Sequence, residues 1–194
     1  MNTIPTTEDA PSTAETLPLK YVNLMEYLPM KYPPTLEEEK NRRIVSNFKM
    51  GRCSRELKNE FTDTINQLKE ERKDMNLRVC FIPASTHHKT ACRYQKLATF
   101  IEKETGIACD YHTILPIQDQ ESGHITGKKA NPAENFTIKT SDVDGKNIIL
   151  IDDVITRGMT FMQTTNKLIR NGANMVRGLF LAKTINPDRV RHSA

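Results

Sequence analysis

Two adjacent aspartates, Asp152 and Asp153, are the residues of this sequence best placed to do chemistry. They follow the apolar run Ile148–Ile151 and precede a Thr-x-Gly-x-Thr turn, Thr156–Thr160. A short apolar run is typical of a buried strand, and ligands of open parallel sheets bind beyond the carboxyl ends of the strands. We therefore expect both carboxylates to face a ligand site.

The turn after the aspartates is suited to a phosphate. Gly158 lets a ligand approach the backbone closely, and the threonine hydroxyls can donate hydrogen bonds. A helix is predicted from Thr160 to Asn171, and the unpaired N–H groups at a helix start favour an anion. The segment thus offers acceptors for sugar hydroxyls or magnesium-bound water, followed by a phosphate cradle. The alternative is that the acids only cap a helix or belong to another nucleotide-binding or receiver fold.

The segment IILIDDVITRGMT, residues 148–160, resembles the signature of the type I phosphoribosyltransferases over its whole length. This resemblance implies an α/β fold, a parallel-sheet type I phosphoribosyltransferase core with an N-terminal helical hood, that binds phosphoribosyl pyrophosphate. It places the catalytic acids Asp152 and Asp153 on the ribose 2- and 3-hydroxyls, where they would also hold Mg²⁺, directly or indirectly. The residues that it places on the 5-phosphate are Thr156, Arg157, Gly158, Met159 and Thr160.

A second loop that could bind an anion lies in CFIPASTHHKTACRYQKLA, from Cys80. The resemblance implies a pyrophosphate loop after the first core strand. The small residues Ala84, Ser85 and Thr86 could wrap an anion with their backbone. Lys89 and Arg93 lie one helical turn apart and could donate charge-assisted hydrogen bonds to the pyrophosphate. Alternatively, both are ordinary surface charges.

Within the superfamily, the same stretch most resembles the competence-protein-F-like (ComF-like) branch, because a Pro-containing turn is followed by basic residues and a helix that ends at Gly106. That branch typically has Arg-Gly-Phe-Asn-Gln, where this chain has Arg93-Tyr94-Gln95. The long segment 118–135 corresponds in order to the family's flexible loop over the site. Its Lys128 would act in catalysis by neutralising charge as pyrophosphate departs; the alternative is a solvated charged loop. The loop also carries His124, and its Lys128, Lys129 and Asn131 ahead of Phe136 resemble the basic pair and Asn that precede a short strand in ComF-like chains.

The rest of the pattern alternates short apolar runs with helical periodicity, which predicts a largely parallel sheet covered on both faces. Helices are expected from Thr35 to Gly51, from Ser54, and around Ala91–Glu104. The expected strands are 77–82, two short ones near Ile114 and Phe136, 148–151, and 175–182. The expected organisation is a flexible tail at 1–17, a helical hood region at 18–73, the core at 74–185 and a C-terminal tail at 186–194.

Composition gives weaker guidance. A net charge of +4 over 194 residues does not indicate nucleic acid as a direct ligand, and an anionic small molecule suits it equally. The four cysteines have no CxxC spacing, which favours free thiols. We find neither a secretory signal nor a membrane-spanning run, and we expect a cytoplasmic protein without a membrane partner. A homodimer is compatible with the sequence.

Three functions are compatible with these patterns. The first is transfer of ribose 5-phosphate from phosphoribosyl pyrophosphate to an unidentified nitrogenous base, with release of pyrophosphate. The second is a non-catalytic module that binds phosphoribosyl pyrophosphate for regulation or for a partner in DNA uptake or repair, since the Arg-Gly-Phe-Asn-Gln motif is missing. The third is an orotate-type enzyme, which IDDVITRGMT also resembles, although the long loop lacks that subfamily's Lys, Lys and His-Gly pattern.

Overall fold

The computed structural model describes residues 20–71, 76–117 and 136–186. The two predicted tails therefore lie outside the described residues, apart from Asn186. The predicted boundary between the hood region and the core, at residues 73 and 74, falls within one of the gaps.

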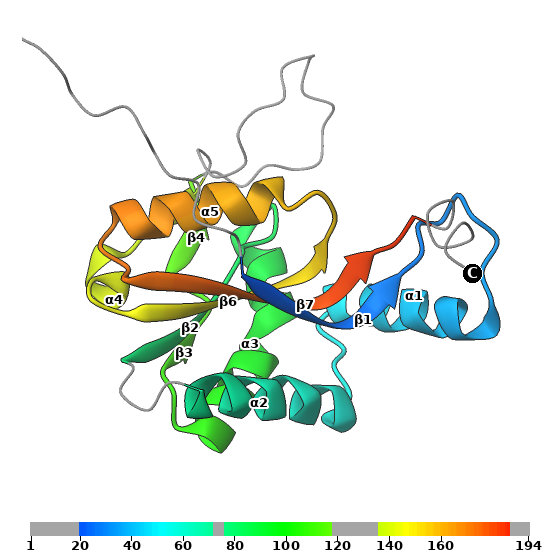
Figure 1. Ribbon diagram of the computed structural model, residues 1–194, viewed down its shortest axis with the longest axis horizontal. Helices are drawn as coiled ribbons and strands as arrows, with labels where there is room; N and C mark the ends of the chain where they lie inside the picture. The colour runs from blue at the N-terminus through cyan, green and yellow to red at the C-terminus, as the bar shows by residue number, and fades with distance from the viewer. Residues whose placement is uncertain (1–19, 72–75, 118–135, 187–194) are drawn as a thin grey trace, which may run out of the picture.

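Five parallel strands form the central sheet, in the order β1, β7, β6, β2 and β3 (Figure 1). Their bounds are β1 Tyr21–Tyr27, β2 Leu77–Phe81, β3 Cys109–Asp110, β6 Asn147–Ile155 and β7 Met175–Thr184. Every strand pair in this sheet is parallel, so the carboxyl ends of the strands lie at one edge. The predicted α/β class with a largely parallel sheet is confirmed.

Both faces of the sheet are covered, which explains why its strands are uninterrupted apolar runs. One face packs against α1 (Leu36–Lys49), α2 (Arg55–Glu70) and α3 (His87–Thr105). The other face packs against α5 (Met159–Arg170) and the short α4 (Thr140–Val143). Figure 1 shows this layering, with α5 on one side of the sheet and α2 on the other.

The predicted helix starts at Thr35 and Ser54 are confirmed. The Thr35 hydroxyl accepts a hydrogen bond from the Glu38 backbone while the Glu38 carboxylate accepts one from the Thr35 backbone, which completes a capping box. The Ser54 hydroxyl accepts from the Leu57 backbone at the start of α2. The α2 residues predicted to share one face are all buried: Leu57, Phe61, Ile65 and Leu68.

Strand β1 was not predicted, and it changes the description of the N-terminal region. Its sequence YVNLMEY mixes polar and apolar residues without strict alternation, and six of its seven positions are half-buried, as suits an edge strand. Because β1 pairs with β7, and α1 and α2 share one hydrophobic cluster with the sheet, residues 20–71 are not purely helical. They are integral to the sheet and its core.

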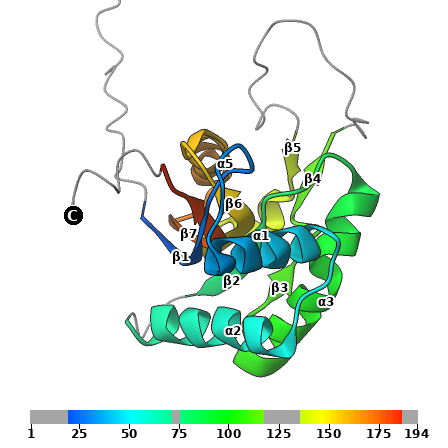
Figure 2. The same cartoon turned by 90° about the vertical axis from the view of Figure 1, so that its right-hand side faces the viewer.

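The two short strands predicted near Ile114 and Phe136 are present, but they do not join the parallel sheet. Strands β4 (Ile114–Pro116) and β5 (Phe136–Ile138) pair with each other in antiparallel fashion. Residues 118–135 connect them. In Figure 2 this pair lies on the opposite side of the molecule from α2, in agreement with its packing in the cluster around α5.

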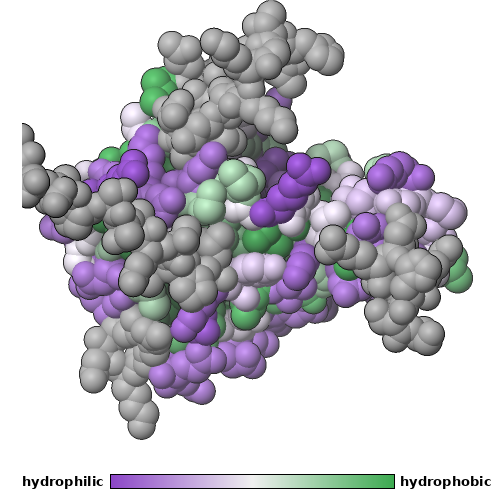
Figure 3. Space-filling model, turned by 45° about the horizontal axis from the view of Figure 1, so that its top comes forward, coloured by the Kyte–Doolittle hydropathy of each residue, from purple (hydrophilic) through white to green (hydrophobic). Residues whose placement is uncertain are grey.

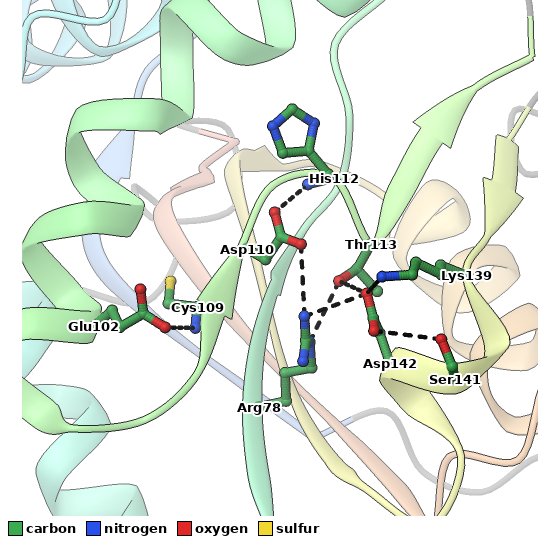
Figure 4. A network of polar contacts seen from close by, with 9 residues as sticks. All are labelled: Arg78, Glu102, Cys109, Asp110, His112, Thr113, Lys139, Ser141 and Asp142. Atoms are coloured by element: carbon green, nitrogen blue, oxygen red, sulfur yellow. Dashed lines mark hydrogen bonds and ion pairs between the residues drawn. The ribbon is translucent and has the colours of Figure 1, made fainter.

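A polar network centred on Arg78 joins this strand pair to the parallel sheet (Figure 4). The Arg78 guanidinium lies 3.5 Å from the Asp110 carboxylate and 3.3 Å from the Asp142 carboxylate. Its Nε also donates to the hydroxyl of Thr113, at 3.3 Å. Arg78 and Asp142 are largely buried, with side chains 17% and 12% exposed. One cation thus ties β2, β3, α4 and the residue before β4 together.

Replacing Arg78 by methionine should therefore destabilise the fold. Breaking a buried ion pair leaves its partners unpaired and costs up to about 3–5 kcal/mol; because the carboxylates here keep some contact with solvent, we expect a loss of about 2 kcal/mol in the free energy of unfolding. Urea unfolding measures it. The matched control is Arg177→Met, which breaks the more exposed Arg177–Glu71 pair and should cost less than about 1 kcal/mol. Equal losses would contradict the role given to Arg78.

On the face that Figure 3 shows, the described residues form only small apolar patches. Hydrophilic side chains cover much of the described surface in Figure 3, with smaller hydrophobic patches between them. The large apolar residues that are exposed among the described residues are Met30, Leu36, Met50, Ile117, Met159 and Ile169. None of the described helices has the length and apolar character needed to cross a membrane.

Candidate functional site

The aspartate pair lies inside strand β6 rather than after its end. The sequence predicted that the strand stops at Ile151, but β6 continues to Ile155. Its pairing with β2 reaches only Ile151, whereas its pairing with β7 continues to Ile155. Asp152 and Asp153 therefore occupy the stretch of β6 where one neighbouring strand has already ended, which opens that side of the strand to other groups.

Helix α3 supplies those groups through two consecutive residues. Arg93 Nη1 lies 2.6 Å from Asp153 Oδ2, and the Tyr94 hydroxyl donates to Asp152 Oδ1 at 3.1 Å. The backbone N–H of Asp153 also donates to Asp152 Oδ1, at 2.7 Å. Each carboxylate thus has its own partner on α3, and the pair is held in a fixed arrangement.

The surroundings of Asp152 disfavour its charged form. Burial, and next the negative charge of Asp153, raise the pKa of Asp152 to about 7. The pKa of the buried Tyr94 hydroxyl lies well above its ordinary value, because of burial and then the nearby Asp152, so Tyr94 acts as a hydrogen-bond donor. Asp152 is therefore a carboxylate whose charge depends on pH in the physiological range.

This electrostatic arrangement predicts a pH dependence of stability. The folded-state pKa of Asp152 is raised, from an ordinary value of 3.8 to about 7, so the folded protein binds this proton more tightly than the unfolded chain does. The resulting stabilisation is fully present below pH 4 and is lost as the pH rises to 7. A tenfold difference in proton affinity is about 1.4 kcal/mol, so the loss should exceed about 1 kcal/mol. Urea unfolding at pH 5 and pH 8 measures it.

The Asp152→Asn variant is the control for this prediction, because asparagine cannot titrate there. The difference in stability between pH 5 and pH 8 should be smaller in this variant than in the wild type. An identical difference in both proteins would show that Asp152 titrates normally in the fold.

The predicted phosphate turn leads directly from β6 into α5. Gly158 has a φ of +74° and occupies the N-cap position, where no side chain caps the helix. A positive φ is readily adopted only by glycine. Helix α5 begins at Met159, one residue before the predicted start. Because a helix start carries backbone N–H groups without intrahelical partners, an uncapped start can bind an anion.

Asp152 and the turn meet at one pocket of about 190 Å³. Asp152 lines it, together with all five residues of the predicted turn, Thr156–Thr160. The further lining residues are Val154, Ile155, Phe161 and Phe180. The pocket therefore combines a carboxylate, hydroxyls and the start of a helix with an apolar wall, which suits a phosphorylated sugar.

The second predicted loop follows β2, the strand next to β6, and so lies at the same edge of the sheet. Thr86 caps α3 by accepting from the Lys89 backbone at 3.1 Å. The Thr90 hydroxyl accepts from Ala84 N and donates to the Thr86 carbonyl, which fixes the turn. Lys89 Nζ and Ser85 Oγ are exposed and 3.5 Å apart. The helix begins at His87, four residues before the predicted start at Ala91, because Thr86 acts as its cap.

The predicted site residues do not all have the expected surroundings. Ala84, Ser85, Thr86 and Lys89 lie together at the start of α3, where Ser85 and Lys89 are exposed but Ala84 is buried, whereas Arg93 is paired with Asp153. Lys128 lies outside the described residues, as do His124, Lys129 and Asn131. Sequence reasoning did not identify Tyr94 or Phe180 as site residues. Tyr94 could have been identified from its position beside Arg93, on a helix that must pack on the sheet.

Magnesium fits this site only as an ion shared with a ligand. Mg²⁺ prefers oxygen ligands, and it is usually held by one or two carboxylates together with water and substrate phosphates. Asp152 offers a carboxylate oxygen at the pocket, whereas Asp153 is occupied by Arg93. Among the described residues, no cluster of three or more His, Cys, Asp or Glu side chains could hold a metal. A bound magnesium would therefore depend on the phosphates of the ligand.

Comparison with known proteins gives remote similarities. No protein-family model matches the chain. A ribose-phosphate pyrophosphokinase from Aeropyrum pernix is 31% identical over 96 residues, which cover 40% of this chain and 31% of that protein. The chain thus spans about a third of the length of that relative.

Two solved structures show weaker likeness. One is the allosteric regulatory enzyme of purine biosynthesis, with a TM-score of 0.42 and 18% identity over 62% of this chain and 25% of that one. The other is a hypoxanthine-guanine-xanthine phosphoribosyltransferase, with a TM-score of 0.35 and 16% identity over 74% of this chain and 63% of that one.

Proposed function

We propose that this protein is a type I phosphoribosyltransferase-like protein that binds phosphoribosyl pyrophosphate with magnesium and transfers its ribose 5-phosphate to a nitrogenous base. The observation that carries the proposal is the pocket that Asp152 shares with the turn Thr156–Thr160 and the uncapped start of α5. A carboxylate accepts hydrogen bonds from sugar hydroxyls, and the helix start binds a phosphate. A ribose 5-phosphate carries both groups, with hydroxyls at positions 2 and 3 and a phosphate at position 5.

The second turn supports the pyrophosphate half of the ligand. Lys89 and Ser85 are exposed at the start of α3, at the edge of the sheet where the ribose pocket lies. Both can donate hydrogen bonds to pyrophosphate, and the lysine also supplies positive charge. The relative from Aeropyrum pernix is named a ribose-phosphate pyrophosphokinase. Similarity to a protein with this name agrees with a ligand that contains ribose phosphate and pyrophosphate.

The proposed reaction needs electrostatic stabilisation rather than a covalent intermediate with the protein. As the bond from ribose to pyrophosphate breaks, positive charge develops on the ribose and negative charge on the leaving group. Asp152 stabilises the first, and Lys89 and the start of α3 stabilise the second. Magnesium supplies further neutralisation of the phosphate charges when it is bound. Lys128, on the segment between β4 and β5, remains a proposed contributor to the departure of pyrophosphate.

The test of the proposed reaction is incubation of the full chain with phosphoribosyl pyrophosphate, magnesium and a pool of nucleobases that includes orotate. Mass spectrometry should detect one new nucleotide, together with base-dependent release of pyrophosphate. Orotidine 5-phosphate as the product would assign the orotate-type activity. A pool that stays unchanged while calorimetry shows binding of phosphoribosyl pyrophosphate would reject the transferase.

A second candidate function is a non-catalytic ComF-like module that binds the same ligand for regulation or for a partner in DNA uptake or repair. It is favoured by one observation: Arg93, at the position where that branch has its Arg-Gly-Phe-Asn-Gln motif, is paired with Asp153 rather than extended toward the pyrophosphate turn. Binding would then stabilise the fold in proportion to ligand concentration, without turnover of any base. A cytoplasmic location and a homodimer remain proposals alongside either function.

A further inference from the structure

We infer that the two aspartates have separate roles: Asp152 contacts the ribose, whereas Asp153 is a positioning residue that acts through Arg93. The inference rests on the proposed function and deepens it. It also departs from the sequence prediction, in which both carboxylates bind the ribose hydroxyls.

Asp152 is held so that one of its two carboxylate oxygens is available. Both hydrogen bonds that it accepts within the described residues fall on Oδ1, from the Tyr94 hydroxyl at 3.1 Å and from the Asp153 backbone at 2.7 Å. The residue is half-buried and lines the pocket. Oδ2 is therefore the oxygen that can accept a hydrogen bond from a ligand, while Oδ1 is fixed by the protein.

Asp153 is enclosed instead. It is only 8% exposed and does not line the pocket that Asp152 shares with the phosphate turn. Its Oδ2 lies 2.6 Å from Arg93 Nη1. A buried carboxylate is costly unless it is paired with an opposite charge, and Arg93 provides that charge. Asp153 thus has a partner within the protein and lies away from the pocket.

Arg93 is enclosed in the same way, and this gives the ion pair a positioning effect. Its side chain is 15% exposed, and its Nε is buried without a hydrogen-bond partner among the described residues. The next residue, Tyr94, is fully buried. Since α3 begins at the pyrophosphate turn and β6 carries Asp152, the Arg93–Asp153 pair fixes the strand with the ribose carboxylate relative to the helix with the pyrophosphate turn.

A double-mutant cycle on the ligand-free protein tests whether Asp153 acts through Arg93. Arg93→Met and Asp153→Asn each leave one charge buried without its partner, whereas the double variant leaves none. Urea unfolding should therefore show the double variant to be more stable than the sum of the two single losses predicts. Additive losses would overturn the inference. Arg93→Lys keeps the positive charge and is expected to unfold at a higher urea concentration than Arg93→Met.

The same variants are then titrated with phosphoribosyl pyrophosphate and magnesium in a calorimeter. Arg93→Met and Asp153→Asn should each weaken binding about tenfold by displacing α3, since 1.4 kcal/mol corresponds to about tenfold in affinity. The double variant should bind no worse than either single variant, because all three lack the same ion pair. If Asp153 contacts the ribose, the two losses will add to about 100-fold, which would overturn the inference. Arg177→Met, which breaks the surface pair with Glu71, is the control and should bind as the wild type does.

Failure of the proposed function has a different signature. A wild-type protein that does not bind phosphoribosyl pyrophosphate would reject the proposed function and with it the ribose contact of Asp152. The urea cycle would still decide whether Asp153 is the structural partner of Arg93. Binding by the wild type, together with additive losses of affinity in the double variant, would leave the proposed function standing and reject only the division of roles.

Discussion

Replacing Asp152 by asparagine is expected to weaken the binding of phosphoribosyl pyrophosphate by about 100-fold while the fold is retained. A hydrogen bond to a charged group contributes about 1.5–3 kcal/mol, and a difference of about 1.4 kcal/mol is tenfold in affinity. The loss of the charge that faces the ribose should therefore be large. The asparagine side-chain oxygen can still accept from Tyr94 and from the Asp153 backbone, the bonds that now hold Asp152. Calorimetric titration in the presence of magnesium measures the change.

The matched control is Asp63→Asn, which removes an equal charge from an exposed position on α2. This variant should bind phosphoribosyl pyrophosphate as the wild type does, which separates a local effect of Asp152 from the effect of net charge. Wild-type affinity in a correctly folded Asp152→Asn protein would refute the assignment of the pocket to the ribose.

Replacing Gly51 by alanine is expected to lower the free energy of unfolding by about 3 kcal/mol or more, at the upper end of single-residue effects. Gly51 has a φ of +73°, and a Cβ there would lie 2.0 Å from the backbone carbonyl oxygen of Cys92. A contact this short forces the backbone to move, because neither partner is a flexible side chain. Urea unfolding measures the loss.

Gly106→Ala is a close control for the effect of Gly51. Gly106 has a similar φ, +69°, but a Cβ there would meet no atom within 4 Å. The Gly106→Ala variant should therefore lose only about 1–2 kcal/mol in the free energy of unfolding, which is the strain of alanine at positive φ. Equal losses for the two variants would show that the contact with Cys92 is unimportant. Because Cys92 directly precedes Arg93 on α3, the Gly51 variant should also weaken ligand binding.

Local patterns identified most of the parallel sheet and the two turns that we propose bind anions. The apolar runs of β2, β6 and β7 are long enough to indicate strands that are buried on both faces. Thr35 and Ser54 have side chains that satisfy the first N–H groups of a helix, so the starts of α1 and α2 followed from residue type alone. The Thr-x-Gly-x-Thr turn combines the one residue that adopts positive φ easily with hydroxyl donors, and this made residues 156–160 recognisable.

Other features depend on contacts between distant residues and have no local signal. Helical spacing placed Lys89 and Arg93 on the same side of α3, but it could not show that Arg93 meets Asp153, 60 positions later. Strand β1 was missed because an edge strand needs no continuous apolar run. The end of β6 was misplaced because its pairing with β7 outlasts its pairing with β2, and register is a property of the assembled sheet.

Two turns at one edge of the sheet are proposed to bind the two ends of phosphoribosyl pyrophosphate. Amide hydrogen exchange, followed by mass spectrometry with and without phosphoribosyl pyrophosphate and magnesium, tests this most directly. Ligand should slow exchange in the peptides that contain residues 84–90 and 156–162, with little change in α2. Unchanged exchange in both turns at saturating ligand, or protection confined to other parts of the chain, would contradict it.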